Sequence, residues 1–174
     1  MENELLVKNE TEYTYERYLK LNQFNMYTKQ KVTLIVLIIS VIVIFLCGIF
    51  MLVIGSYDRA IFYIALALVF SALYVLLPSI QTKKIFKSDN LLKSNIKNTF
   101  EFYNDRIDIS NKTSNSKLDY QDIYKVYERK EAFYIYLNRI QVLIVSKDCF
   151  IMGDAEKLRN LLKEKVGKDY VNKI

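Results

Sequence analysis

Three acidic side chains lie close together in the second half of the chain: Asp119, Asp122 and Glu128. Paired carboxylates can act as general acid and base or bind a divalent cation. On one extended strand, however, Asp122 and Glu128 would be about 20 Å apart, too far to act on one atom. We therefore expect Asp122 to cap a turn and Glu128 to be a solvated strand end. No catalytic residue, metal ligand or cofactor site is predicted.

Basic side chains are the second group that could bind something. They are Lys125, Arg129, Lys130 and Arg139. Placed at the ends of predicted hairpins, they could form a basic patch, and three interpretations stay open: solubility, attraction to an anionic lipid surface, or a headgroup pocket. Nucleic acid is not expected as a partner, because no recognition helix or stacking motif accompanies the charge.

Composition narrows the chemistry further. The chain contains no His, so the commonest general base and metal ligand are missing. Its two cysteines, Cys47 and Cys149, give no disulfide framework, which agrees with a reducing compartment. Residues 81–174 hold 19 Lys and Arg against 13 Asp and Glu, so the excess positive charge lies there.

Two long apolar runs, residues 32–54 and 60–80, contain no charged side chain. A helix of the first run would be about 35 Å long, enough to cross a hydrocarbon core of about 30 Å. The five residues between the runs predict an antiparallel transmembrane hairpin, and Pro78 predicts the end of its second helix. Small residues are expected to form the contact between the helices. They are Ser40, Gly48, Ala67 and Ser71.

Basic residues flank both predicted spans, whereas the turn has only Arg59 beside Asp58. The positive-inside rule therefore predicts a two-span protein of the cell membrane with both termini in the cytoplasm. Lysines after the second span are expected to contact anionic lipids. These are Lys83, Lys84, Lys87, Lys93 and Lys97.

The first 31 residues are expected to form a short strand near residues 4–8 and an amphipathic helix. Thr14 is a suitable N-cap for a helix that begins at Tyr15. Three placements of this helix stay open: on the membrane surface, against the cytoplasmic domain, or continuous with the first span.

Beyond a basic connection over residues 81–97, with a short helix near 90–96, the periodicity changes to two. Alternating runs around Asn104-Asp105 and around Asn138-Arg139 predict two β-hairpins, and 118–120 and 123–128 predict further strands. Asp154 is a suitable N-cap for a helix over 155–166 with an apolar stripe. About six strands and a closing helix suggest a pleckstrin-homology-like outline.

Several runs in this sequence resemble the YcxB-like family of bacterial membrane proteins. They are 13–19 (YTYERYL), 120–128 (YQDIYKVYE), 133–137 (FYIYL) and 149–154 (CFIMGD). The resemblance implies an architecture and a location, and no reaction. It assigns packing and turn roles to a set of motif residues. They are Tyr120, Asp122, Ile123, Val126, Tyr127, Glu128, Phe150, Gly153 and Asp154.

The sequence therefore predicts an α+β membrane protein in four parts. They are 1–31, a strand and helix; 32–80, the hairpin; 81–97, the basic connection; and 98–174, a cytoplasmic YcxB-like domain. We expect a non-enzymatic protein that contacts membrane lipids and binds a protein partner through this domain. The alternative is an immunity or envelope-stress protein that acts through its hairpin.

Overall fold

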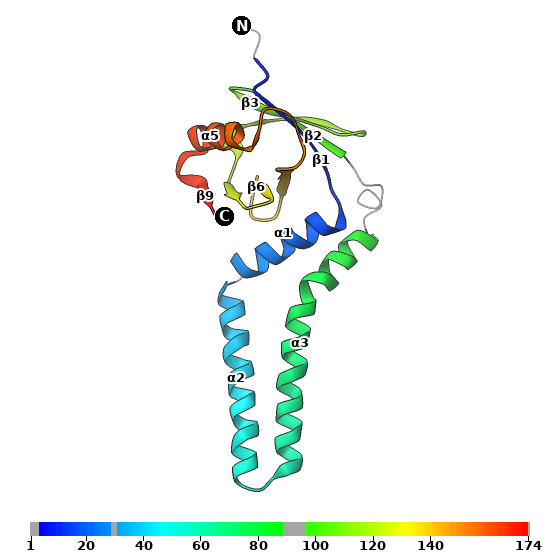
Figure 1. The fold of residues 1–174 in the computed structure, drawn as a ribbon, viewed down its shortest axis with the longest axis vertical. Helices are drawn as coiled ribbons and strands as arrows, with labels where there is room; N and C mark the ends of the chain where they lie inside the picture. The colour runs from blue at the N-terminus through cyan, green and yellow to red at the C-terminus, as the bar shows by residue number, and fades with distance from the viewer. Residues whose placement is uncertain (1–3, 29–30, 89–96, 174) are drawn as a thin grey trace. The chain divides into compact units, whose positions relative to one another are not determined.

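The computed structural model describes residues 4–28, 31–88 and 97–173. The chain forms two compact units: residues 15–89, here the helical unit, and residues 1–14 with 90–174, here the strand unit. The fold is α+β, as predicted, and Figure 1 shows its elements in chain order. The strand before the helices and the strands after them belong to the same unit, whereas the sequence had placed residues 1–14 with the following helix.

The helical unit contains α1 (Tyr15–Thr28), α2 (Lys31–Val53) and α3 (Tyr57–Ser88). α1 begins at Tyr15, as the Thr14 cap predicted. α2 and α3 form an antiparallel hairpin (Figure 1), whose turn contains Gly55 at φ 78°. Residues 34–53 and 57–85 are each long and apolar enough to cross a membrane, with mean hydropathy 3.3 and 2.5.

Small residues form part of the contact between α2 and α3. Gly48, Ala60 and Ala67 are buried, and a Cβ on Gly48 would lie 2.9 Å from Cγ1 of Ile64. The prediction was therefore right for Gly48 and Ala67. It was wrong for Ser40 and Ser71, which are exposed. Each of these serine hydroxyls donates a hydrogen bond to the carbonyl four residues earlier, so neither needs a partner on the other helix.

Pro78 lies inside α3 and does not end it, contrary to the prediction. Proline removes one backbone donor and bends a helix without having to stop it, and α3 is bent in its C-terminal part (Figure 1). The hydroxyl of Thr82 donates to the carbonyl of Pro78 at 2.7 Å and accepts from Nδ2 of Asn22 at 2.7 Å. This pair of bonds fixes α1 against the bend. The helix expected near 90–96 lies outside the described residues.

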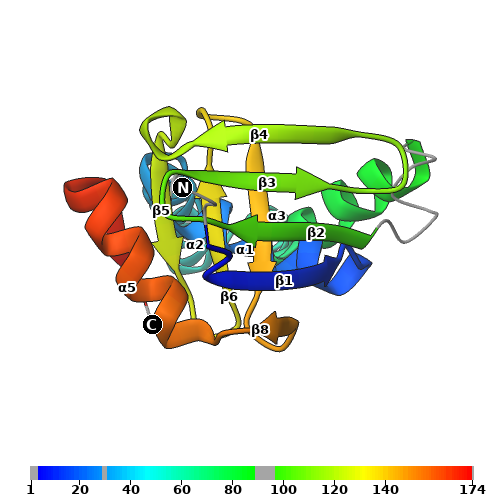
Figure 2. The same ribbon diagram turned by 90° about the horizontal axis from the view of Figure 1, so that it is seen from above.

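The first sheet of the strand unit has five strands in the order β4-β3-β2-β1-β8, all antiparallel. Figure 2 shows β4, β3, β2 and β1 side by side in that order. The bounds are β1 Val7–Glu12, β2 Lys97–Phe102, β3 Arg106–Ser110, β4 Asn115–Asp119 and β8 Phe150–Met152. The hairpin around Asn104-Asp105 is confirmed, because β2 and β3 flank it. Phe100, Phe102 and Ile107 are fully buried, so the period of two is confirmed as well.

The second sheet has four strands in the order β7-β6-β5-β9. Its bounds are β5 Lys125–Glu128, β6 Ala132–Tyr136, β7 Val142–Ser146 and β9 Tyr170–Asn172. The hairpin of β6 and β7 was predicted, but β9 was not, and it pairs with β5 in parallel. Short 3₁₀ turns, η1 (Tyr120–Asp122) and η2 (Gly167–Asp169), precede β5 and β9.

The C-terminal helix α5 (Ala155–Val166) has the predicted bounds. The Asp154 carboxylate accepts a hydrogen bond from the backbone N–H of Lys157 at 2.8 Å, so the predicted N-cap is confirmed. The helix buries three leucines of its apolar stripe. They are Leu158, Leu161 and Leu162.

Strand β1 joins the two sheets through buried polar side chains. Nδ2 of Asn9 donates to the carbonyl of Ser146 at 2.8 Å, and the N–H of Ser146 donates to Oγ1 of Thr11 at 2.9 Å. The N–H of Ile144 donates to the hydroxyl of Tyr13 at 3.0 Å. Side chains of residues 9, 11 and 13 thus form hydrogen bonds with backbone N–H and carbonyl groups along one edge of β7. The N-terminal strand, which spans 7–12 and not 4–8, is therefore an integral part of the strand unit.

Replacing Gly48 with Leu tests the helix contact. Because no space is left beside Ile64, Gly48→Leu should lower the free energy of unfolding by about 1–3 kcal/mol. Thermal unfolding of the full chain in detergent, followed by circular dichroism, measures this change. Ala65→Leu is the matched control, because Ala65 is exposed on α3 and should tolerate the larger side chain. Equal stabilities of the two variants would contradict the close approach.

Candidate functional site

Glu128 is fully buried, so the expectation of a solvated strand end was wrong. Its carboxylate accepts hydrogen bonds from Nζ of Lys147 at 2.6 Å and from Nη2 of Arg159 at 2.6 Å. Nε of Arg159 lies 2.9 Å from the second oxygen, which also accepts from the hydroxyl of Tyr170. The donors come from the turn after β7, from α5 and from β9. Because these residues follow Glu128 at distances of 19 to 42 positions, the local sequence could not reveal the cluster.

The donors keep Glu128 ionised. Burial favours a higher pKa, but the hydrogen bonds from Arg159, Lys147 and Tyr170 outweigh it and lower the pKa of Glu128 to about 2. Burial, followed by the hydrogen bond to this carboxylate, raises the pKa of Tyr170. A carboxylate held as an anion far below neutral pH is poorly suited to proton transfer. Its geometry suits a structural role, in which it connects β5, α5 and β9.

The other two acids do not join Glu128. Asp119 is exposed at the end of β4, opposite Arg106 of β3. Asp122 is exposed within η1, whose N-cap position belongs to Asp119, so Asp122 does not cap this turn. Among the residues that the structure describes, no group of three His, Cys, Asp or Glu side chains could hold a metal ion.

The predicted basic patch is divided between two places. Lys125 lies opposite Tyr136 at one end of the β5–β6 pair, the end from which the loop with Arg139 begins. Arg129 and Lys130 lie at the other end, in the turn between the strands. The Arg129 guanidinium donates to the carbonyl of Lys173 at 2.5 Å, so it also fixes the chain beyond β9.

The lysines expected at the lipid surface fall into three groups. Lys83 and Lys84 are exposed on α3. Lys97 begins β2, and its ammonium pairs with the carboxylate of Glu10 on β1, so it acts within the sheet. Lys87 lies on α3 with its side chain outside the described residues, and Lys93 lies outside them altogether.

The motif residues of the YcxB-like resemblance occupy packing and turn positions. Tyr120 donates a hydrogen bond to the carbonyl of Tyr103 at 2.7 Å, and the ring of Tyr127 packs edge-on against Tyr136, 5.7 Å between centroids. Ile123 and Val126 are buried, and Phe150 is half-buried on β8. Gly153 has φ 73° and approaches Val7, where a Cβ would lie 3.1 Å from the valine Cγ2. Together with Asp154, these residues position β5, β8 and α5.

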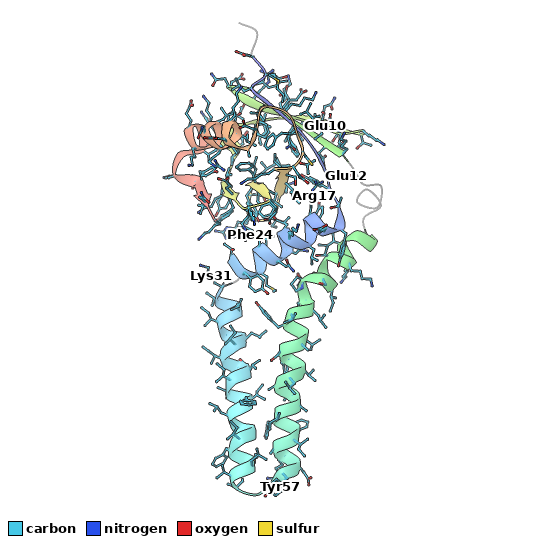
Figure 3. The ribbon with its side chains drawn as sticks, viewed as in Figure 1. Glu10, Glu12, Arg17, Phe24, Lys31 and Tyr57 are labelled. Carbon is cyan, nitrogen blue, oxygen red and sulfur yellow. The ribbon has the colours of Figure 1, made fainter. Side chains whose placement is uncertain are left out.

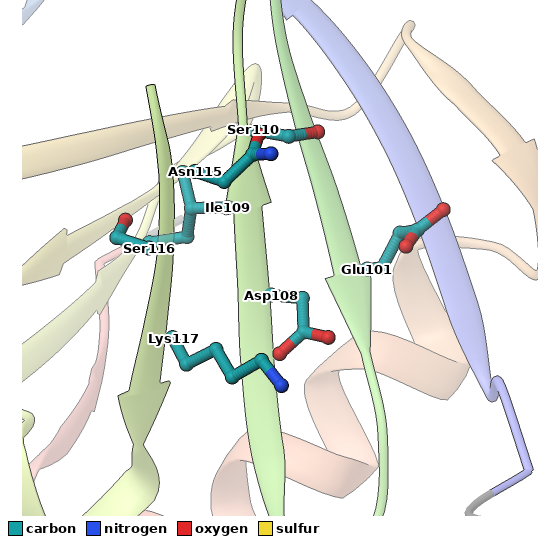
Figure 4. A pocket seen from close by; sticks show the side chains of 7 residues that line it. All are labelled: Glu101, Asp108, Ile109, Ser110, Asn115, Ser116 and Lys117. Carbon is teal, nitrogen blue, oxygen red and sulfur yellow. The ribbon is translucent and has the colours of Figure 1, made fainter.

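A hollow of about 330 Å³ lies on the five-stranded sheet. Figure 4 shows the side chains that line it, from β2, β3 and β4. They are Glu101, Asp108, Ile109, Ser110, Asn115, Ser116 and Lys117. We call this hollow the sheet-face site. Sequence reasoning missed it because it depends on the register of three strands, although the alternating polar positions of each strand were visible.

Charges cross the sheet-face site in a row set by strand register. Lys8 of β1 lies opposite Glu101, Glu101 opposite Asp108, and Asp108 opposite Lys117. Nζ of Lys8 is 2.8 Å from Oε1 of Glu101, and this bond raises the pKa of Lys8. Nε of Arg106 donates to Asp108 at 3.0 Å. Both acids therefore have cationic neighbours, and the site suits hydrogen bonding and ion pairing rather than bond cleavage.

Residues 102–162 match the sequence model of the family described as YcxB-like protein. The matched segment runs from the end of β2 into α5, and it confirms the resemblance for the runs at 120–128, 133–137 and 149–154. The run at 13–19 lies outside the matched segment. No curated protein and no solved structure matches the chain significantly.

Replacing Glu128 with Gln tests the buried cluster. Removing the charge leaves Lys147 and Arg159 without their anion, so Glu128→Gln should lower the free energy of unfolding at pH 7 by about 3 kcal/mol. The folded-state pKa lies below the ordinary value of 4.5, so this contribution is complete above pH 4.5 and is lost as the pH falls towards 2. The difference in free energy of unfolding between the unchanged protein and Glu128→Gln should therefore decrease as the pH falls from 4.5 towards 2. Denaturant titrations of the full chain in detergent measure this difference. Glu164→Gln is the control, because that carboxylate is 69% exposed and pairs with neighbouring Lys165. A difference in free energy of unfolding that stays constant from pH 7 to pH 2 would contradict the ion pairs proposed for Glu128.

Proposed function

We propose that this chain, whose residues 102–162 match the YcxB-like family model, is a non-enzymatic integral membrane protein whose cytoplasmic domain binds a protein partner. The proposal has three parts: insertion of the helical hairpin, its orientation, and the use of the sheet-face site. The arrangement of two sheets with a C-terminal helix supports a pleckstrin-homology-like domain.

Exposed apolar surface on the hairpin supports insertion. Only 6% and 11% of the two candidate spans are buried, whereas the core helix of a soluble protein would be mostly buried. Large side chains such as Phe50 and Ile61 face outward. Water would disfavour this surface by roughly 25 cal/mol per Å², whereas lipid covers it without that cost. Lys31 and Tyr57 lie at opposite ends of the hairpin (Figure 3), where a charged group and an amphipathic ring suit the two interfaces.

Strand pairing supports the orientation. β1 precedes the hairpin and β2 follows it, yet the two strands are hydrogen-bonded neighbours. Both must therefore lie on the same side of a bilayer, which requires an even number of spans between them. Exposed Lys83 and Lys84 lie at the C-terminal end of the second candidate span, whereas its N-terminal end has Arg59 beside Asp58 in the first turn of α3. The positive-inside rule then assigns the strand unit to the cytoplasm.

The sheet-face site is the observation that carries the binding proposal. It presents a lysine, two carboxylates, one hydroxyl and one amide side chain on one exposed face, whereas Ile109 and Ser116 alternate to the opposite face of their strands. A polypeptide surface offers the matching chemistry: basic and acidic side chains for the charges, and amides for the polar groups. A protein partner therefore fits this site better than a small apolar ligand, which would need an enclosed apolar pocket.

Cysteine labelling tests the topology. In intact cells a membrane-impermeant maleimide should leave Cys47 and Cys149 unmodified, because the first lies in the bilayer and the second in the cytoplasm. Cys149 should react after the membrane is permeabilised. With both cysteines replaced by Ser, Ser56→Cys in the turn should react from outside. Labelling of Cys149 in intact cells would contradict the orientation.

Charge reversal tests the sheet-face site. A photo-crosslinking amino acid at exposed Asn115, which lies on the same face of β4 as Lys117, should give a discrete protein adduct in native membranes. Lys117→Glu should reduce its yield about tenfold, as the loss of one interfacial ion pair would. Lys168→Glu, at an exposed position in η2, is the control and should leave the yield unchanged. Equal yields from both variants would refute the site. Resistance to an envelope-active peptide carried by residues 28–85 alone would instead favour the hairpin as the functional part.

A further inference from the structure

The loop between β6 and β7, residues 137–141, has a fixed conformation. Oδ1 of Asn138 accepts hydrogen bonds from the N–H groups of Ile140 and Gln141, both at 2.8 Å. Nδ2 of Asn138 donates to the Gln141 side chain at 2.8 Å, and the N–H of Leu137 donates to the Gln141 carbonyl at 3.1 Å. Asparagine commonly closes turns in this way. The side chains of this loop therefore have defined directions.

This fixed loop presents an apolar side chain to its surroundings. Ile140 is 89% exposed, more than any other large apolar residue in the described structure. A single exposed apolar side chain is ordinary on a protein surface. Here, however, the bonds of Asn138 hold the backbone on both sides of it, so the isoleucine cannot easily fold back onto the sheet. We call Ile140 and its neighbour Arg139 the loop tip.

Amphipathic and cationic groups lie at the same end of the sheet. The N–H of Tyr124 donates to the carbonyl of Tyr136 at 2.8 Å, which brings Tyr124, 49% exposed, to the strand end where the loop begins. Lys125 pairs in register with Tyr136. Asp122 precedes them in η1 and is the acidic side chain nearest in sequence. An exposed isoleucine, an exposed tyrosine ring and two cations at one end of the sheet are the kinds of side chain that suit a lipid interface.

We infer that the loop tip is a membrane-contact site, in which Ile140 enters the interface of an anionic bilayer while Arg139 and Lys125 meet lipid phosphates. The inference rests on the proposed function, because the bilayer is the one that holds the hairpin. Only two residues, Tyr13 and Thr14, lie between the end of β1 and the start of α1. Such a short connection to the helical unit gives the membrane surface a high effective concentration at the domain. A contact made by few side chains is then sufficient.

The absence of tryptophan from the chain gives a direct test. Ile140→Trp introduces a single fluorophore, and the full chain is reconstituted into phosphatidylglycerol vesicles with brominated acyl chains. We expect at least twofold quenching relative to vesicles without bromine, together with a blue-shifted emission. Lys112→Trp, in the exposed loop between β3 and β4, is the matched control and should be quenched little. Adding Arg139→Glu to I140W should reduce quenching in phosphatidylglycerol more than in phosphatidylcholine.

Vesicle flotation in the same samples separates the two proposals. Protein that fails to float with the vesicles contradicts membrane insertion, and with it the proposed function. Protein that floats while the I140W fluorophore is quenched no more than that of K112W overturns the loop-tip inference alone. Emission of I140W that shifts only when a soluble protein fraction is added also overturns it, because the tip would then contact protein.

Discussion

The pairing of β1 with β2 limits how every other part of the chain can be arranged. In the sheet, Glu12 at the end of β1 lies opposite Lys97 at the start of β2, and the whole helical unit is inserted between these two positions. The strand unit therefore has no continuous sequence. It can fold only when the segments before and after the helices meet on one side. Two antiparallel helices satisfy this condition, because they return the chain to the side from which it left.

The same strand also closes the second sheet. An edge strand exposes unpaired backbone groups that favour aggregation, and β7 is the outermost strand of its sheet. Asn9, Thr11 and Tyr13 bond to the backbone of β7 at Ile144 and Ser146. Buried Asn and Thr would otherwise carry a desolvation cost, and here that cost is offset by protecting an edge. At the opposite side of this sheet β9 is short, and the Glu128 cluster connects it to β5 and α5.

Local pattern predicted those features whose cause is local. The two uncharged runs, the turn at Asn104-Asp105 and the cap at Asp154 each need only neighbouring residues, and the structure contains all three. The features that were missed depend on distant partners. Glu128 shares the inward-facing positions of β5 with buried Val126. A carboxylate can remain there because Lys147 and Arg159 bond to it, and the strand pattern cannot reveal these two partners. The helix likewise continues past Pro78, where Thr82 and Asn22 bond at the bend.

The sheet-face site likewise depends partly on local sequence pattern and partly on contacts between distant segments. Alternation of polar and apolar residues predicted that β2 and β3 have an outer polar face, but only the register aligns Glu101, Asp108 and Lys117 into one row. This row lies on the five-stranded sheet, whereas the loop tip extends from the end of the four-stranded sheet. Lipid contact at the loop tip would therefore leave the sheet-face site open. The two proposed contacts therefore use different residues on different sheets.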